Sequence, residues 1–155
     1  MALKNQVANV YEAGLRNVGS YQVSGTPWVT GSNQSSTYLT DGKLVRFQLP
    51  YVSKSITVIN TGANDLRLHF HSGSGVTIAS TDGQLETGNA SSNVMAGHHY
   101  VTVPKNNGSI TMDVKCKEIY LSNHSGGSTG YEILAELTQI KSARMYELTG
   151  SGISE

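Results

Sequence analysis

The stretch KLVRFQLPYVSKSITVIN, residues 43–60, decides the fold, because apolar and polar side chains alternate along it. Val45, Phe47 and Leu49 fall on one face of an extended chain, and the alternation resumes at Ile56. Successive side chains of a strand point to opposite faces, so a period of two indicates strands with one buried face. The stretch therefore predicts two half-buried strands, one in each half.

Alternation of the same kind runs through most of the remaining chain, with turns rich in Gly and Asn between the runs. The strongest hairpin signal is Asn107-Gly108, because Asn and Gly adopt the positive φ of tight turns. No helical pattern is long enough for the crossover that parallel strands need, so the strands are expected to be antiparallel. Strands are predicted at 21–24, 28–30, 43–49, 54–60, 65–71, 76–79, 100–103, 109–114, 117–121, 131–137 and 140–148, and a long loop at 80–96. We therefore predict an all-β fold, an antiparallel β-sandwich of the jelly-roll kind with an extended N-terminal arm.

The composition narrows the classes of partner. The 155 residues suit one domain, and charged residues make up 14%, below the roughly 25% of an ordinary soluble protein. Basic and acidic residues number 11 each, so no net charge attracts nucleic acid or an anionic membrane. No apolar run approaches the roughly 20 residues that span a bilayer. We therefore expect neither nucleic acid nor a membrane as a partner.

The chain is expected to divide into an arm and edge segment at 1–40, a β-sandwich at 41–148 and a polar tail at 149–155. The first forty residues are predicted to add little to the core, yet they contain three tyrosines and the single tryptophan. Tyr and Trp anchor interfaces because they bury a large area and keep one polar atom to satisfy. The alternative is that these rings complete the edge of the sandwich. The predicted subunit-interface residues are Tyr11, Leu15, Arg16, Tyr21, Trp28 and Tyr38.

No residue grouping predicts catalysis or a cofactor. His69 and His71 share one face of a predicted strand, as a His-x-His metal site requires, but the simpler interpretation is a pair of outward polar residues. The run 126–130 matches the Gly-x-Ser-x-Gly nucleophile elbow, which needs a helix after it, whereas a strand is predicted there. The only cysteine, Cys116, is expected to be a buried apolar side chain. We therefore expect a protein that is not an enzyme and binds neither metal nor cofactor.

Stretches near both ends of the chain carry a family resemblance. They are GLRNVGSYQVSGTP at 14–27, VKCKEIYLS at 114–122, AELT at 135–138 and YELTGSG at 146–152. They resemble small virion structural proteins of tailed phages, particularly those of marine cyanobacteria and similar hosts. The likeness spans most of the chain, is weakest at 72–97, and includes no catalytic motif.

The resemblance implies assembly on a virus particle in the host cytoplasm. The first expectation is a head decoration or cement protein that binds the major capsid protein and forms a homo-oligomer, with a trimer favoured. A tail or neck component is the alternative, and a host-glycan-binding module with Trp28 and Tyr38 as its aromatic platform is a third. Exposed strand edges and an aromatic arm suit repeated subunit contacts.

Overall fold

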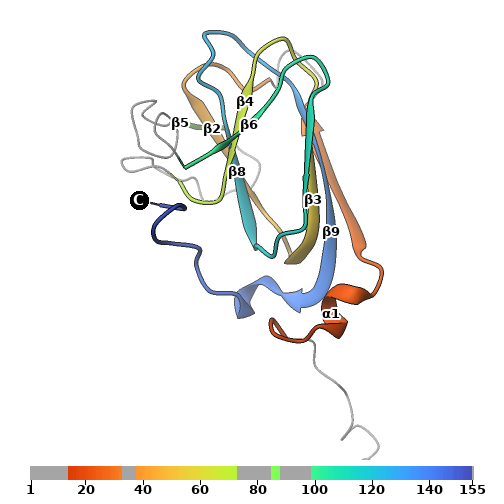
Figure 1. Ribbon diagram of the computed structural model, residues 1–155. Coiled ribbons are helices and arrows are strands. Elements are labelled where there is room, and N and C mark those ends of the chain that lie inside the picture. The colour runs from red at the N-terminus through yellow and green to blue at the C-terminus, as the bar shows by residue number, and fades with distance from the viewer. Residues whose placement is uncertain (1–13, 33–37, 73–84, 88–98, 155) are drawn as a thin grey trace, which may run out of the picture.

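The computed structural model describes residues 14–32, 38–72, 85–87 and 99–154, and nearly all of its regular structure is β (Figure 1). One short helix, α1 (Gly19–Gln22), precedes the strands, and a 3-10 helix at Ser142–Arg144 follows them. The strands are β1 (Thr26–Ser32), β2 (Lys43–Gln48), β3 (Tyr51–Asn60), β4 (Leu66–His69), β5 (Leu85–Thr87), β6 (Val101–Val103), β7 (Ser109–Met112), β8 (Glu118–Ser122) and β9 (Tyr131–Lys141). No helix in these described ranges is long and apolar enough to cross a membrane.

The strands form two antiparallel sheets, which confirms the predicted β-sandwich. A four-stranded sheet has the order β1-β9-β3-β7, and a five-stranded sheet has the order β5-β2-β8-β4-β6. The first four strands pair antiparallel with the last four in reverse order: β1 with β9, β2 with β8, β3 with β7 and β4 with β6. A ribbon of strand pairs wound in this way is a jelly roll, and β5 is an additional edge strand beside β2.

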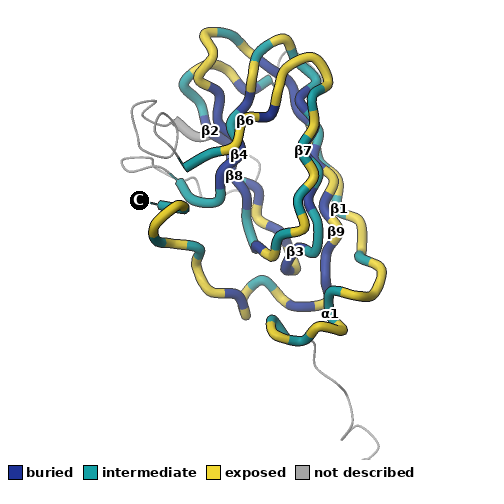
Figure 2. The backbone as a smooth tube through the Cα atoms, in the orientation of Figure 1, coloured by how far each residue is buried: buried dark blue, intermediate teal, exposed yellow. Residues whose placement is uncertain are grey.

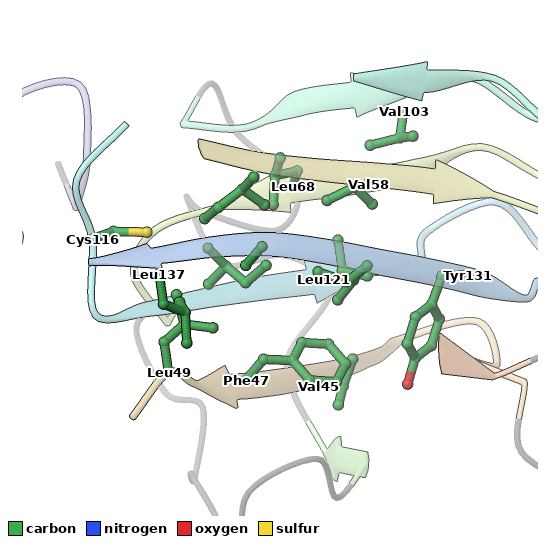
Figure 3. Packing of buried hydrophobic residues seen from close by; sticks show 14 of the residues in the cluster. Val45, Phe47, Leu49, Val58, Leu68, Val103, Cys116, Leu121, Tyr131 and Leu137 are labelled. Carbon is green, nitrogen blue, oxygen red and sulfur yellow. The ribbon is translucent and has the colours of Figure 1, made fainter. Parts of the chain in front are cut away.

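The core lies between the two sheets and follows the alternation of the sequence. In β9 the side chains of Tyr131, Ile133, Ala135 and Leu137 are buried, whereas the residues between them are partly or fully exposed. Figure 3 shows the facing side chains in this layer, and the ring of Phe47 packs edge-to-face on that of Tyr131 with centroids 5.5 Å apart. Because every second residue of each sheet enters this layer, one run of alternation fixes which face of its strand is inside.

The predicted hairpin at Asn107-Gly108 is wrong, because the strands that flank it belong to different sheets. β6 pairs with β4 and β7 pairs with β3, so the turn crosses from one sheet to the other. The turn chemistry itself is as expected: Asn106 and Asn107 have φ of 58° and 64°, in the left-handed region. A side chain on Gly108 would overlap Pro104 at the start of the turn. Turn residues therefore located the reversal of the chain without specifying the partner strands.

The first forty residues contribute more to the sandwich than predicted. β1 is an edge strand that pairs with β9 over its full length. Leu39 is fully buried in the core, and its backbone exchanges hydrogen bonds with Thr129. The predicted strand at 21–24 is wrong, because α1 extends to Gln22 and an irregular link to β1 follows.

Two further predictions differ at other parts of the chain. The predicted strand at 140–148 is wrong: β9 continues to Lys141, and the chain then enters the 3-10 helix and an irregular segment. β5 falls inside 80–96, which was predicted to be loop. The strand predicted at 76–79 lies outside the described residues.

Candidate interaction surface

The outer side of the four-stranded sheet presents an apolar band to solvent. The strand register places Val29 of β1 beside Leu134 of β9, which in turn lies beside Thr57 of β3 and, through it, Thr111 of β7. Val29 is 71% exposed and Leu134 is 45% exposed, and the two threonine hydroxyls are hydrogen-bonded at 2.9 Å. We call this outer side, with its outward side chains from all four strands, the β1–β9 face.

The neighbouring rows of the β1–β9 face follow from the same register. One row has Gly31, Glu132, Ile59 and Ser109, and the other has Pro27, Glu136 and Ser55. Of the outward residues in the three rows, only the two glutamates are charged, and they flank Leu134 along β9. In these three rows the face is therefore apolar at Val29 and Leu134, with an acidic residue of β9 on either side of Leu134.

No described strand or helix lies across the β1–β9 face in Figure 1, and Figure 2 shows exposed segments along β1. The link from α1 to β1 reaches one end of the face, where Gly25 packs so closely on Glu136 that a Cβ there would lie 2.7 Å from the Cβ of the glutamate. Val18 and Val23, which directly precede and follow α1, are also exposed. The exposed apolar side chains of this part of the chain are therefore valines.

Two of the aromatic residues predicted at an interface, Trp28 and Tyr38, pack in part against their own domain. Trp28 is half-buried, and its ring meets that of Phe47 edge-to-face with centroids 6.4 Å apart. Tyr38 is half-buried beside Gly130, where a Cβ would lie 2.8 Å from its ring. The interpretation that these rings complete the edge of the sandwich fits both positions. A glycan platform would need a well-exposed ring, whereas the ring of Trp28 is half-buried against the core.

Leu15 and Tyr21 are brought together, because the Tyr21 hydroxyl donates a hydrogen bond to the Leu15 carbonyl at 3.0 Å. Lys115 also donates to this carbonyl, and its ammonium lies 5.7 Å from the centroid of the Tyr21 ring. Lys54 donates to the Val23 carbonyl at 2.9 Å. Two lysines thus hold residues 15–23 against the sandwich.

The remaining features of this region are a cavity and one exposed predicted residue. Tyr21, Lys54, Asp113, Val114 and Lys115 line a cavity of about 380 Å³. Burial, and to a lesser degree the nearby Tyr146, raise the pKa of Tyr21. Arg16 is exposed, and Tyr11 lies outside the described residues.

The prediction that His69 faces solvent is wrong. Its side chain is fully buried, with the Tyr120 ring stacked on it at a centroid distance of 5.7 Å. Nδ1 lies 2.8 Å from the His71 carbonyl, which only accepts, so Nδ1 carries the proton and Nε2 accepts from the Ser122 hydroxyl at 3.0 Å. Burial lowers the pKa of His69 to about 4, so the ring is neutral at pH 7.

This arrangement leaves His69 without a free nitrogen for a metal. The half-buried His71 uses Nδ1 on the Ser72 carbonyl at 2.6 Å. Among the residues that the structure describes, no three His, Cys, Asp or Glu side chains are grouped as metal ligands. The His-x-His pair is therefore an internal hydrogen-bonding unit.

The remaining candidates for chemistry are the run 126–130, the thiol of Cys116 and a second cavity. The run 126–130 leads directly into β9, so the helix that a nucleophile elbow requires is replaced by a strand, as predicted. Cys116 is fully buried and lies 3.3 Å from the Ser53 hydroxyl; burial raises the pKa of its thiol to about 11. A cavity of about 510 Å³ near the start of β8 is bordered by the ion pair of Lys117 and Glu147.

No family model matches the chain, and comparisons with curated proteins and with solved structures found no match. The identification of the jelly roll therefore rests on the strand order, and the β1–β9 face rests on the register of its strands.

Two apolar residues at polar strand positions indicate the β1–β9 face in the sequence, although the interface prediction was based on aromatic residues. In YEILAEL, residues 131–137, Leu134 occupies a polar position of the alternation between two glutamates. In TPWVTGS, residues 26–32, Val29 falls on the face opposite Trp28. One such residue is common on a surface, but two of them on paired strands form a contiguous exposed apolar patch.

Proposed function

We propose that this chain is a virion structural protein, and specifically a decoration or cement protein that binds the major capsid protein lattice and stabilises the head. The observation that carries the proposal is the exposed pair of Val29 and Leu134 at the centre of the β1–β9 face. Apolar side chains on adjacent strands of an uncovered sheet contribute to stability when another protein removes them from water.

The fold and the resemblance support the same proposal. Jelly rolls occur in viral capsid proteins and in lectins, although a fold alone does not determine function. The resemblance to small virion proteins of tailed phages favours a role in a virus particle over a role as a lectin. The packing of Trp28 on Phe47 counts against a lectin.

A cement protein acts by mass action. A subunit that binds the assembled lattice but not its separate parts lowers the free energy of the assembled state alone. Each contact can be weak, because a lattice presents many equivalent sites and an oligomer can engage several at once. A small homo-oligomer, with a trimer favoured, is part of this proposal.

The proposal is tested on particles of the virus whose genome encodes the chain. Quantitative mass spectrometry of purified particles should find the chain in an amount comparable with the major capsid protein. Particles from a genome without the gene should release their DNA at a lower temperature, and added purified chain should restore the original temperature. Absence from particles would refute the proposal, and a copy number matching one ring at a single vertex would favour a neck component.

A further inference from the structure

Strand β1 is the longest edge strand in the described part of the chain. It ends the four-stranded sheet, and β9 is the only strand that pairs with it among the described residues. β1 has seven residues, whereas the edge strands β5, β6 and β7 have three, three and four. Its pairing with β9 has no bulge, and its sequence, TPWVTGS, contains no charged residue. Short length, bulges and charges commonly keep an edge strand from pairing with another chain, and β1 has none of these.

The hydrogen bonds of β9 show which backbone groups of β1 lie on the free edge. The N–H of Thr61, directly after β3, donates to the Gly130 carbonyl at 3.1 Å, so Gly130 directs its backbone groups toward β3. These directions alternate along an antiparallel strand, so Ile133 directs its groups toward β1, where it pairs with Thr30. Every second residue of β1, counted from Thr30, is therefore bonded to β9.

The residues between them, Pro27, Val29 and Gly31, direct their backbone groups away from β9. Because proline has no N–H, this free edge presents three carbonyls and two N–H donors. A proline is tolerated in an edge strand where its nitrogen faces away from the sheet, as that of Pro27 does here. The free edge therefore has donors and acceptors available for another strand.

A second copy of β1 is complementary to this edge when it runs antiparallel with its Val29 opposite Val29. Each Val29 N–H then donates to the partner's Val29 carbonyl, and each Gly31 N–H donates to the partner's Pro27 carbonyl. These four hydrogen bonds use every N–H on the two free edges. The missing N–H of Pro27 leaves only the Gly31 carbonyl of each copy without a donor.

Side-chain packing favours this register. The two exposed valines lie side by side, so the apolar band of Val29 and Leu134 continues from one copy into the other. A shift that sets Val29 opposite Gly31 keeps four hydrogen bonds but loses this contact. Glu132 of one copy and Glu136 of the other lie in one row across the joint, three strand spacings or about 14 Å apart. This separation exceeds the screening length of about 8 Å at physiological salt, so their repulsion is weak.

We infer that β1 pairs with β1 of a second copy, antiparallel about a two-fold axis at Val29, so that two four-stranded sheets join into one. A symmetric contact of this kind closes on itself and gives a dimer. The inference goes beyond the proposed function, which favours a trimer, and it sets two β1–β9 faces side by side on one surface. It is tested without particles, so its failure leaves the proposed binding to the capsid standing.

The first experiment measures disulfide cross-linking of the full chain carrying Val29→Cys under mild oxidation. Opposite Cα atoms of a hydrogen-bonded pair are about 5.5 Å apart, a distance that a disulfide spans. The matched control is Val101→Cys, at an exposed position on edge strand β6 of the other sheet, and the native Cys116 is buried in both variants. Each linking rate is divided by the rate at which the same thiol reacts with a small reagent.

We expect Val29→Cys to link roughly tenfold faster than Val101→Cys or more, because the pairing raises the effective concentration of its thiols. Equal rates would overturn the inference. A mixture of Val29→Cys and Thr111→Cys tests head-to-tail pairing of β1 with the other edge of the sheet, β7. Faster linking between these two variants than of Val29→Cys with itself would identify β7 as the partner edge and also overturn the inference.

The second experiment follows the monomer–dimer equilibrium by analytical ultracentrifugation. Val29→Pro removes the two central hydrogen bonds of the dimer but none between β1 and β9, because the Val29 N–H lies on the free edge; thermal unfolding checks its fold. Val29→Thr keeps the N–H and the branched shape. The proline variant should dimerise roughly thirtyfold more weakly than the wild type, and the threonine variant should lose much less. Equal dimerisation of the two variants, or an oligomer that Val29→Pro leaves unchanged, would overturn the inference.

Discussion

Lowering the pH should destabilise the fold through His69. In the unfolded chain its imidazole titrates near 6.5, whereas burial lowers its pKa to about 4 in the fold. The neighbouring Arg67 and His71 lower the pKa further, and the hydrogen bond to the His71 carbonyl partly opposes these effects. The folded state therefore binds the proton less readily than the unfolded state. The stability from neutral His69 is complete above pH 6.5 and is lost as the pH falls toward 4.

The size of the loss follows from the two pKa values. One pKa unit corresponds to about 1.36 kcal/mol, so the fall from about pH 7.5 to about pH 4.5 should cost about 2.5 kcal/mol of unfolding free energy at this residue. His69 is fully buried, so solvent screening does not reduce this value greatly.

The assay is urea unfolding at these two pH values for the wild type, His69→Gln and His124→Gln. His69→Gln should be less stable at pH 7.5, because it loses the ring stacked on Tyr120, but it should lose about 2.5 kcal/mol less than the wild type on acidification. The exposed His124 is the control, and its variant should follow the wild type. An equal loss in His69→Gln and the wild type would refute the assignment of a buried neutral imidazole.

Four substitutions and one thiol reaction test the packing. Ile133→Ala should cost about 2–5 kcal/mol in urea unfolding, and Leu134→Ala on the same strand less than about 1 kcal/mol; similar losses would contradict the register. Asn60→Leu should cost about 1–3 kcal/mol for each of the two backbone carbonyls that it leaves without a donor, and an unchanged midpoint would refute this role. Gly62→Ala should lower the melting temperature, at a cost of about 1–3 kcal/mol or more, because a Cβ there overlaps a neighbouring backbone; wild-type melting would exclude the overlap. Cys116 should react with a thiol reagent at pH 8 only after unfolding, and rapid reaction of the native protein would contradict its burial.

The sandwich could be predicted because local alternation and a buried face are linked. In β9 every second residue from Tyr131 to Leu137 is apolar, and a strand with that period can bury only one side. Absence of a helical pattern then left antiparallel pairing as the consistent arrangement. These signals are local, so one sequence was sufficient for them.

The choice of partner strand is a long-range property and was predicted less well. Asn106 and Asn107 adopt the positive φ that their residue types favour, but nothing local indicates that β6 and β7 enter different sheets. That outcome depends on β3 and β4, which pair with β7 and β6 respectively. A turn signal therefore predicts a change of direction more reliably than a hairpin.

The same limit explains why the exposure of individual side chains was hard to predict. Alternation correctly separates Trp28 from Val29 onto opposite faces, but only the position of β1 beside β9 shows that the tryptophan faces inward. His69 occupies a polar position of its strand and is nevertheless buried, because Tyr120 from β8 stacks on it. In both cases a side chain from a distant part of the sequence determines exposure.

The central claim, that the β1–β9 face is the contact surface on the particle, is tested most directly by hydroxyl-radical footprinting of the chain free in solution and bound to particles. We predict that labelling of Leu134 falls on binding, while labelling of the exposed Tyr146, which lies beyond the sandwich strands, stays the same. Unchanged labelling of Leu134 in the bound chain would contradict the claim.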